Sequence, residues 1–248
     1  MIALYVFWIR QVKKFFRVPA RIFGSLGQPL LYLVALGLGL GSAVGSVGDT
    51  SYISYLVPGI MGLTVLFASM FSGIELITDR RFGFLRETLV APVRRIWVYL
   101  GMAAGGATIA TLQGMLVFFL GLLFGFSPAS WWVALAAIPV MFLIALLFTM
   151  VALMMATKIR DFQSFPIIIN FVIFPLFFLS GAIFPLEGIP KGLEVVTQLN
   201  PLTYGIDLLR EVVVGAGFYS IGLGFAVLIG LNLLCIVWGA QLFKKMTI

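Results

Sequence analysis

The residues able to do chemistry are few in this chain, and their types argue against most enzymes. The sequence has no histidine and one cysteine, Cys235, inside an apolar run. Without histidine, a nucleophile lacks its usual general base and a metal site lacks its commonest ligand. No Gly-Lys pair occurs, so the phosphate-binding loop G-x-x-x-x-G-K-[ST] is absent. We expect no catalytic residue, no metal and no cofactor in this chain.

One carboxylate, Glu75, lies near the end of a long apolar run. Two interpretations stay open for it: an interfacial acid beside Arg80 and Arg81, which we prefer, or a buried functional group. Other polar residues inside apolar runs are few, namely Thr64, Ser69, Ser72, Gln113, Asn170 and Asn232. A proton- or sodium-coupled carrier needs more such groups along its path. The chain therefore takes its driving force from elsewhere, or transports nothing actively.

Charge is concentrated in one internal segment, DRRFGFLRETLVAPVRR at 79–95, where seven of seventeen residues are ionisable. Phe82, Leu85 and Leu89 follow helical spacing, and the proline at 92 disfavours helix before it. The segment is either an amphipathic helix that docks a partner or an ordinary basic loop. The residues predicted to dock the partner are Arg81, Phe82, Phe84, Leu85, Arg86, Glu87 and Leu89.

The elements that position these residues must be membrane helices. The chain is 62% hydrophobic and 10% charged, whereas soluble domains average about 25% charged residues. Apolar runs long enough to cross a bilayer recur, without the short alternation of a spanning barrel. We predict one all-α membrane domain over 1–248. Its six spans are expected at 26–46, 55–77, 97–124, 131–156, 166–184 and 219–242.

The basic residues predict how these spans are oriented. Fourteen of the 16 Lys and Arg residues fall in 1–25, 78–96, 157–165 and 243–248. Basic residues gather on the cytosolic side of membrane proteins. Both termini are therefore predicted to be cytosolic, in the inner membrane of the cell. This rule also explains the net charge of +7, so no nucleic-acid partner is expected.

The first 25 residues do not resemble a cleavable signal peptide. They predict an amphipathic helix along the inner membrane surface. Its apolar face comprises Tyr5, Trp8, Ile9, Val12, Phe15 and Phe16. Its basic face comprises Arg10, Lys14, Arg17 and Arg21. Such a helix either anchors the chain to lipid or docks a partner protein, and the pattern leaves both open.

Two further patterns concern packing. Glycines spaced four apart, at 37, 41 and 45 and again at 101 and 105, permit close helix contacts within or between subunits. Residues 185–215 are too polar for a span and predict two short outer helices. Asn200 is placed to cap the second, with Pro201 at its first position. Its predicted apolar stripe comprises Leu202, Ile206, Leu209 and Val213.

Two separated stretches together resemble a known family. FPLFFLSGAIFPLEGIP (174–190) with LNPLTYGIDLLR (199–210) resembles the C-terminal motif of ABC type-2 transporter permeases. RRFGFLRETLVAPVRR (80–95) is similar to the cytosolic loop of their drug-exporter branch, typified by daunorubicin-resistance permeases. With the six-span layout, the resemblance covers essentially the whole chain.

The resemblance implies a half-transporter that pairs with a second copy of itself and with two ATP-binding subunits, which hold ATP and magnesium. It implies a coupling helix at 80–91, and outer re-entrant helices at 185–215 that include Asn200, Pro201, Tyr204 and Arg210. Substrate would leave between the two copies, past spans one, two and five. The candidate pathway residues are Glu75, Asn170, Phe171, Phe174 and Phe178.

From these observations we predict the permease subunit of an ATP-driven exporter for an amphipathic or hydrophobic substrate, drug-like or lipid-like. The alternative within transport is a polysaccharide or a lipid-linked glycan. A membrane channel or a membrane-embedded enzyme remains the alternative from another class.

Overall fold

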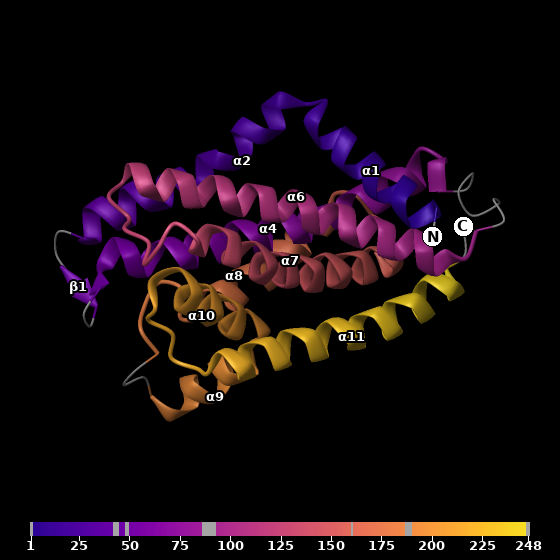
Figure 1. Ribbon diagram of the computed structural model, residues 1–248. Helices are drawn as coiled ribbons and strands as arrows, with labels where there is room; N and C mark the ends of the chain where they lie inside the picture. The colour runs from indigo at the N-terminus through magenta and orange to yellow at the C-terminus, as the bar shows by residue number, and fades with distance from the viewer. Residues whose placement is uncertain are drawn as a thin grey trace.

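The computed structural model describes residues 2–41, 45–47, 50–85, 93–159, 161–186 and 190–246. Within these ranges the fold is helical, apart from the short strands β1 (Ser46–Val47) and β2 (Thr50–Ser51), which pair antiparallel. The all-α prediction is confirmed. Long helices run side by side, and both chain termini lie at the same end of the bundle (Figure 1).

The helices follow the chain in this order: α1 (Ile2–Phe16), α2 (Pro19–Tyr32), the π-helix η1 (Leu33–Leu40), α4 (Tyr52–Arg81), α6 (Arg95–Leu123), α7 (Val133–Lys158), α8 (Ser164–Phe178), α9 (Lys191–Leu199), α10 (Pro201–Val214) and α11 (Ile221–Lys245).

Among the described residues, five helical stretches are long and apolar enough to cross a membrane. They are Ile22–Gly39, α4, α6, α7 and α11, and each overlaps a predicted span; the first begins four residues and ends seven residues before the predicted 26–46. The predicted span at 166–184 corresponds to α8, an apolar helix of 15 residues. At 1.5 Å per residue α8 is about 22 Å long, against about 30 Å of hydrocarbon. Helix length therefore supports five of the six predicted spans.

Helix α4 forms the centre of the bundle. Within its most apolar stretch 72% of residues are buried, against 17% in both α11 and the Ile22–Gly39 stretch. It packs against α6, α7, α8 and α10. A helix that is apolar all round is stable only inside protein or in lipid. The contrast places α4 in protein surroundings and leaves much of α2 and α11 open on the outside of the bundle.

Helix α1 lies against α6 through the predicted glycine pair. A Cβ atom on Gly101 would come within 2.7 Å of the Leu4 carbonyl oxygen, and one on Gly105 within 2.6 Å of the Gln11 Cβ. The buried face of α1 is Phe7, Gln11 and Phe15, whereas Tyr5 and Phe16 of the predicted apolar face are exposed. The glycines at 101 and 105 therefore mediate a contact within the chain.

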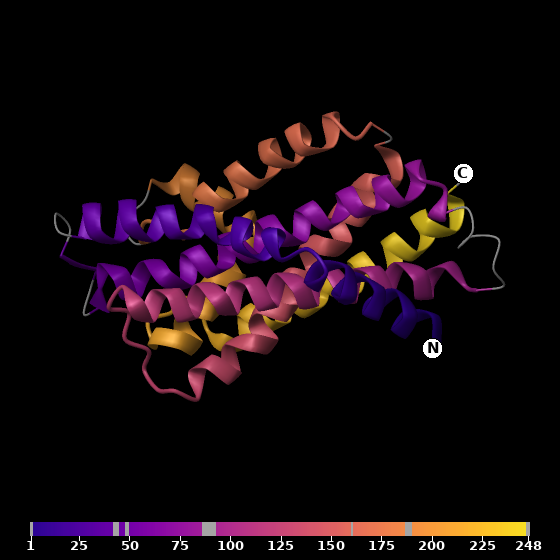
Figure 2. The same cartoon turned by 90° about the horizontal axis from the view of Figure 1, so that it is seen from above.

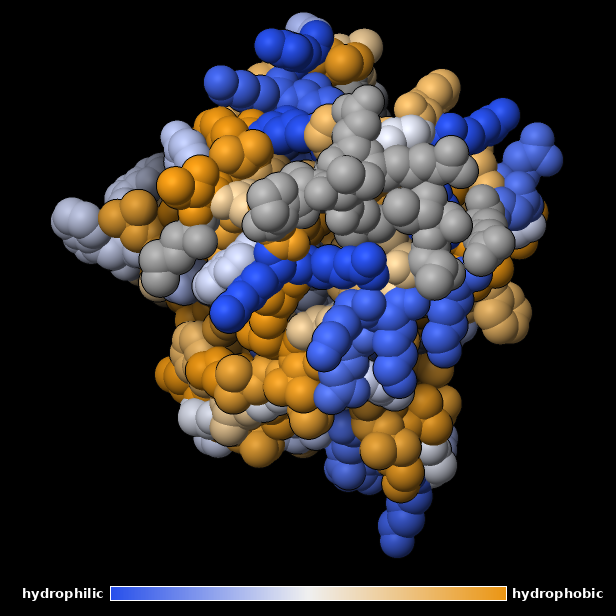
Figure 3. Space-filling model, turned by 90° about the vertical axis from the view of Figure 1, so that its right-hand side faces the viewer, coloured by the Kyte–Doolittle hydropathy of each residue, from blue (hydrophilic) through white to orange (hydrophobic). Residues whose placement is uncertain are grey.

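One end of the bundle gathers the basic residues, and we call it the basic end. Arg95, at the start of α6, donates to the carbonyl oxygens of Phe243, Lys244 and Met246 at 2.8–3.4 Å. Carbonyls at a helix C-terminus lack partners within the helix and attract cations. Arg80 at the end of α4 donates to the Thr157 carbonyl oxygen at 3.3 Å. Hydrophilic side chains crowd this end in Figure 3.

The opposite end, the far end, holds the two short helices predicted within 185–215. The Asn200 side chain accepts a hydrogen bond from the Leu202 N–H at 3.0 Å, and Pro201 opens α10. The predicted cap is thus confirmed. All four residues of the predicted stripe are buried. Helix α10 packs against α4, α7 and α11, whereas α9 is exposed along almost its whole length.

Candidate functional site

At the basic end, α1 is bound to the end of α4 by two ion pairs. The Arg10 guanidinium donates to both carboxylate oxygens of Asp79 at 2.7 and 2.8 Å. The Lys14 ammonium lies 3.9 Å from the Glu75 carboxylate. In both helices the partners are four residues apart, about one turn, so the pairs lie one above the other. Two predicted basic residues of α1 therefore face α4.

The other two predicted basic residues of the first segment differ from this pair. Arg17 follows α1 and is exposed. Arg21 lies in α2, and its side chain is outside the described part of the structure. The Trp8 indole N–H donates to the Thr108 hydroxyl at 3.0 Å and so adds a polar contact between α1 and α6. The first segment is thus two helices with a bend between them, and α1 is packed on the chain itself.

The predicted helix over 80–91 is wrong at its beginning. Helix α4 continues to Arg81, and Gly83 then adopts φ +81°, a left-handed conformation that ends helices. Phe82 is 80% exposed, whereas Leu85 is 3% exposed. Because Gly83 separates them, these two residues do not share the predicted apolar stripe. The predicted docking residues Arg86, Glu87 and Leu89 lie outside the described residues.

Two neighbouring side chains show how this turn is held. The Arg10 guanidinium lies over the Phe84 ring, 3.6 Å from its centroid. Such cation–π contacts contribute about 0.5–2 kcal/mol. Arg10 therefore connects α1 both to the last turn of α4 and to the residue after Gly83, while Arg81 and Phe82 remain exposed.

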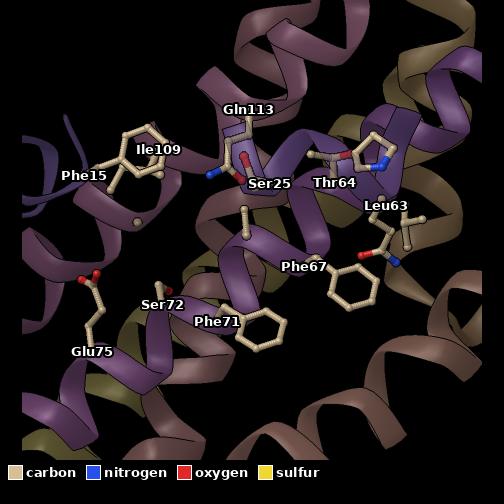
Figure 4. Close-up of a pocket in the computed structure, with 15 residues that line it drawn as sticks. Phe15, Ser25, Leu63, Thr64, Phe67, Phe71, Ser72, Glu75, Ile109 and Gln113 are labelled. Atoms are coloured by element: carbon tan, nitrogen blue, oxygen red, sulfur yellow. The ribbon is translucent and has the colours of Figure 1, made fainter. Parts of the chain in front are cut away.

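A cavity of about 420 Å³ opens beside these ion pairs, between α1, α2, α4 and α6. Figure 4 shows the phenyl rings and polar side chains that face it. Its polar lining consists of Ser25, Gln28, Thr64, Ser72, Glu75 and Gln113. Aromatic rings of Phe15, Phe67 and Phe71 supply much of the remainder. This arrangement suits binding, because the lining joins aromatic rings to a few polar side chains and one carboxylate.

Glu75 stands at the α1 side of the cavity. It is 7% exposed, and the Lys14 ammonium lies 3.9 Å from its carboxylate. Both interpretations of Glu75, an interfacial acid beside Arg80 and Arg81 or a buried functional group, stay predictions. The sequence did not indicate the approach of Lys14, which the bidentate pair between Arg10 and Asp79, one turn away, brings to Glu75.

The other candidate pathway residues lie apart from the cavity. Asn170 and the three phenylalanines belong to α8, which runs along one edge of the bundle (Figure 2). Phe171 is 82% exposed. The Phe174 ring meets that of Phe67 edge-on, with centroids 6.1 Å apart, and it stacks near Phe178 at 6.3 Å. Phe67 thus separates the α8 residues from the cavity that it lines.

Most of the residues that line the cavity could not be predicted from the sequence. Ser25 and Gln28 of α2 were assigned no role, nor was Phe67. The sequence of α4 did contain an indication of the cavity, namely the polar residues Thr64, Ser72 and Glu75. They are eight and three residues apart, a spacing that places them on one face of the helix. Gln113 of α6 was noted as polar, but only the fold brings it opposite that face.

At the far end, Arg210 of α10 is 3% exposed. It donates to the Gly181 carbonyl oxygen at 3.0 Å and lies over the Tyr55 ring at 3.8 Å. Tyr55 donates to the same carbonyl oxygen at 2.9 Å. Burial lowers the pKa of Arg210, because desolvation disfavours its charged form. Tyr204 lies nearby in the chain and donates to the Gln198 carbonyl oxygen.

The described geometry is that of a helical membrane bundle with a charged end and a binding cavity. A family model described as "ABC-2 type transporter" matches residues 2–214. The chain belongs to the ABC-2 type transporter family. The permease is similar to Nodulation protein J of Rhizobium meliloti (strain 1021), with 32% identity over 84% of the chain and 80% of the relative.

Two further relatives carry transport names. The "Inner membrane transport permease YadH" of Escherichia coli (strain K12) is 28% identical over 92% of the chain and 89% of the relative. The "Putative transport permease ycf38" of Cyanophora paradoxa is 28% identical over 92% of the chain and 83% of the relative. The permease is thus an integral membrane protein of a transport family whose membrane subunits are typically not catalytic.

Proposed function

We propose that the permease is the membrane subunit of an ATP-driven exporter that moves an amphipathic or hydrophobic substrate out of the cytosol or its adjoining leaflet. ATP and magnesium bind to two separate ATP-binding subunits, and two copies of the permease form the transport path. Both termini face the cytosol. The relative "Inner membrane transport permease YadH" supports a place in the inner membrane.

The observation that carries this proposal is the construction of the basic end. A large apolar ring, Phe82, is exposed among basic residues, on a turn that Arg10 fixes from two sides. Exposed aromatic residues on a rigid support are the usual anchors of protein interfaces. An ATP-binding subunit seated here would act directly on the end of α4, the central helix of the bundle.

The proposed path between two copies draws support from α2 and α8. Together with η1, both leave apolar side chains on the outside of the bundle, among them Leu31, Leu38, Phe171 and Phe178. The residues proposed for outer re-entrant helices are those of α9 and α10. There Arg210 ties α10 to the start of α4. Gly41, directly after η1, also lies against Tyr52 at the start of α4.

The test is to replace Phe82 by glutamate. A charged residue at a partner-facing anchor should weaken binding of the ATP-binding subunit about tenfold or more, a typical loss at an interface hot spot. Membrane insertion and the thermal unfolding temperature of the isolated permease should stay unchanged, because the ring is exposed. Co-purification from membranes and substrate-stimulated ATPase activity measure the effect.

The matched control is Phe218→Glu, at another exposed phenylalanine, which lies at the far end. It should leave co-purification intact. Leu85→Glu should instead destabilise the permease itself, because Leu85 is buried. Wild-type co-purification and export in the Phe82 variant would contradict the docking role. If no ATP-binding subunit accompanies the wild-type permease, a channel or a membrane-embedded enzyme becomes the better account.

The second candidate is export of a polysaccharide or a lipid-linked glycan. The cavity favours it more than the sequence did, because aromatic rings and two amide side chains line the same space. Sugars stack on aromatic rings and bond to amides. Uptake into inverted vesicles that contain the whole complex separates the two candidates: glycan transport without transport of apolar cations would favour the second.

A further inference from the structure

Gln113 of α6 is a buried polar side chain that borders the cavity between α1, α2, α4 and α6. The residue is 7% exposed, and in Figure 4 its amide points into the cavity, near Ser25. In the described part of the chain, no hydrogen bond to this amide is found. A buried amide is costly unless a ligand or water pairs with it. Gln113 is therefore placed to bind a polar group inside the cavity.

Both donors and acceptors of hydrogen bonds line the cavity. Gln28 of α2 brings a second amide, and each amide has two N–H donors and one accepting carbonyl. The hydroxyls of Ser25 and Thr64 donate within their own helices, to the Ile22 and Ile60 carbonyl oxygens at 2.7 and 2.8 Å. Their oxygen lone pairs remain as acceptors. A ligand group that both donates and accepts therefore meets more of the lining than a group that does only one.

The carboxylate at the edge of the cavity already has partners in the protein. The Lys14 ammonium lies 3.9 Å from Glu75, and Glu75 has a further interaction besides this one. Among the described lining residues Glu75 is the ionisable group. A charged ligand would lose its water there without gaining an unpaired opposite charge from these residues, which is unfavourable. The described lining therefore favours a neutral ligand.

The rest of the cavity suits an apolar body that contains a ring. Phe15, Leu63 and Ile109 contribute apolar surface. The rings of Phe67 and Phe71 are nearly parallel, with centroids 6.1 Å apart, and a flat ligand ring can pack against them. The volume of about 420 Å³ falls within the usual range of about 300–1,000 Å³ for small-molecule sites. It suits one small molecule and is too small for a polymer.

We propose that this cavity binds one neutral small molecule with an apolar, ring-containing body and a carboxamide edge. A primary amide or a lactam presents an N–H donor and a carbonyl acceptor side by side, and the Gln113 amide presents the same two groups in the opposite order. Two parallel N–H to carbonyl hydrogen bonds then join them, while the ring lies against Phe67 and Phe71. That the molecule is the transported substrate rests on the proposed function; its binding does not.

The experiment uses the full-length permease in phosphatidylcholine nanodiscs and four tritiated probes that share a para-butylphenyl body. Their polar ends are a primary amide, its N,N-dimethyl amide, a carboxylate and a methylammonium group, and empty nanodiscs measure the partitioning into lipid. We expect saturable binding of the primary amide at one molecule per permease, at least tenfold tighter than each other probe. The dimethyl amide keeps the carbonyl but has no N–H, so it tests the paired hydrogen bonds. The two ions test the preference for a neutral ligand.

Gln113→Leu removes the amide at similar volume. It should lower the preference for the primary amide over the dimethyl amide from tenfold to about twofold or less. A merely structural role would weaken both probes equally and leave this ratio unchanged. Gln198→Leu, at an exposed glutamine of α9, is the matched control and should keep the ratio.

Ala68→Phe narrows the cavity without changing a polar group and should abolish saturable binding. Its control, Ala136→Phe at an exposed alanine of α7, should leave binding unchanged. If the Ala68 variant does not fold, the ratio measured in Gln113→Leu decides. Equal binding of the two amides, tighter binding of an ion, no saturable binding, or an unchanged ratio in Gln113→Leu would overturn the proposal, as would unchanged binding in a folded Ala68 variant.

Probe binding is independent of the ATP-binding partner, because the isolated permease is used. If the primary amide binds as expected but no ATP-binding subunit associates with the wild-type permease, the proposed function fails and the binding site stands. If the subunit associates and the primary amide does not bind, the binding site fails and the proposed function stands.

Discussion

The two ends of the bundle hold their charged residues in opposite ways. At the basic end, Arg10 and Lys14 of α1 pair with Asp79 and Glu75 of α4, and the two basic side chains remain partly exposed. At the far end, the buried Arg210 has a carbonyl oxygen and an aromatic ring as its described contacts. The first arrangement joins charges of opposite sign near solvent. The second holds a buried charge through a carbonyl oxygen and an aromatic ring, with Asp207 of the same helix as an acid that favours the charged form.

This difference in how the charges are held predicts which helices can shift against α4. A partly exposed ion pair exchanges protein partners for water at low cost, because most of its attraction is offset by solvation. A buried guanidinium that leaves its partners loses bonds it cannot replace. We therefore expect α1 to shift on α4 far more readily than α10 shifts on the start of α4. An input of energy at the basic end fits this asymmetry.

The largest expected effect comes from breaking the far end. Arg210→Ala removes a hydrogen bond, a cation–π contact and the volume of a buried side chain. Its cost should be about 3 kcal/mol of the free energy of unfolding, as for other large buried truncations. Arg210→Met keeps most of the volume and should cost clearly less. Chemical unfolding in detergent measures both; equal losses would show that charge, not packing, dominates there.

An intermediate effect is expected at the basic end. Asp79→Asn should cost about 2 kcal/mol, because it removes a charge-assisted bidentate pair from a largely buried carboxylate. Lys14→Gln, which removes the longer ion pair, should cost less than about 1 kcal/mol. A double-mutant cycle with Arg10→Gln isolates the coupling energy. A coupling energy near zero between Arg10 and Asp79 would contradict the view that ion pairs hold α1 on α4 at the basic end.

The smallest effect concerns an exposed charge between α7 and α8. Asp161 accepts hydrogen bonds from the Ser164 hydroxyl and from the backbone N–H groups of Gln163 and Ser164. The Ser164 hydroxyl is the main cause that lowers the pKa of Asp161. Its contribution to stability is therefore present above the unfolded pKa of about 3.9 and is lost as pH falls through the lower folded value.

Asp161→Asn should remove this slight acid dependence and otherwise change stability little. Unfolding temperatures of the variant and of the wild type, compared between pH 3 and pH 6 in steps of about half a unit, measure it. A loss as large as that of Asp79→Asn would mean that exposed charges at this end matter as much as buried ones.

The sequence pattern was sufficient to predict features that depend on the residues of a single helix. The structure has helices long and apolar enough to cross a membrane at five of the predicted spans, and it confirms the cap by Asn200 and the buried stripe of α10. Apolar length, caps and helical period act over a few residues, so the sequence predicts them. The end of the predicted span at 166–184 could not be read from apolar length, because the apolar run continues past Phe178 but helix α8 ends there.

The sequence pattern was insufficient to predict which side chains are buried where that depends on the turn that follows a helix or on a neighbouring helix. The spacing of Phe82 and Leu85 fits one face of a helix. In the structure the left-handed Gly83 lies between them, so that Phe82 is exposed and Leu85 is buried. In α1, the predicted apolar face and the buried face overlap only in part: Phe15 belongs to both, whereas Tyr5 and Phe16 are exposed. Phe7 and Gln11 are buried because the glycines of α6 admit α1 on their side.

The sequence by itself determined that this protein is a helical membrane permease of its family, with basic residues gathered into a few segments. Composition, apolar length and motif residues carry that information locally. Only the tertiary structure decided that Lys14 meets Glu75, that Phe82 stays exposed, and that α2 and α6 complete a cavity on one face of α4. Those outcomes depend on contacts between residues far apart in the chain, which no local period encodes.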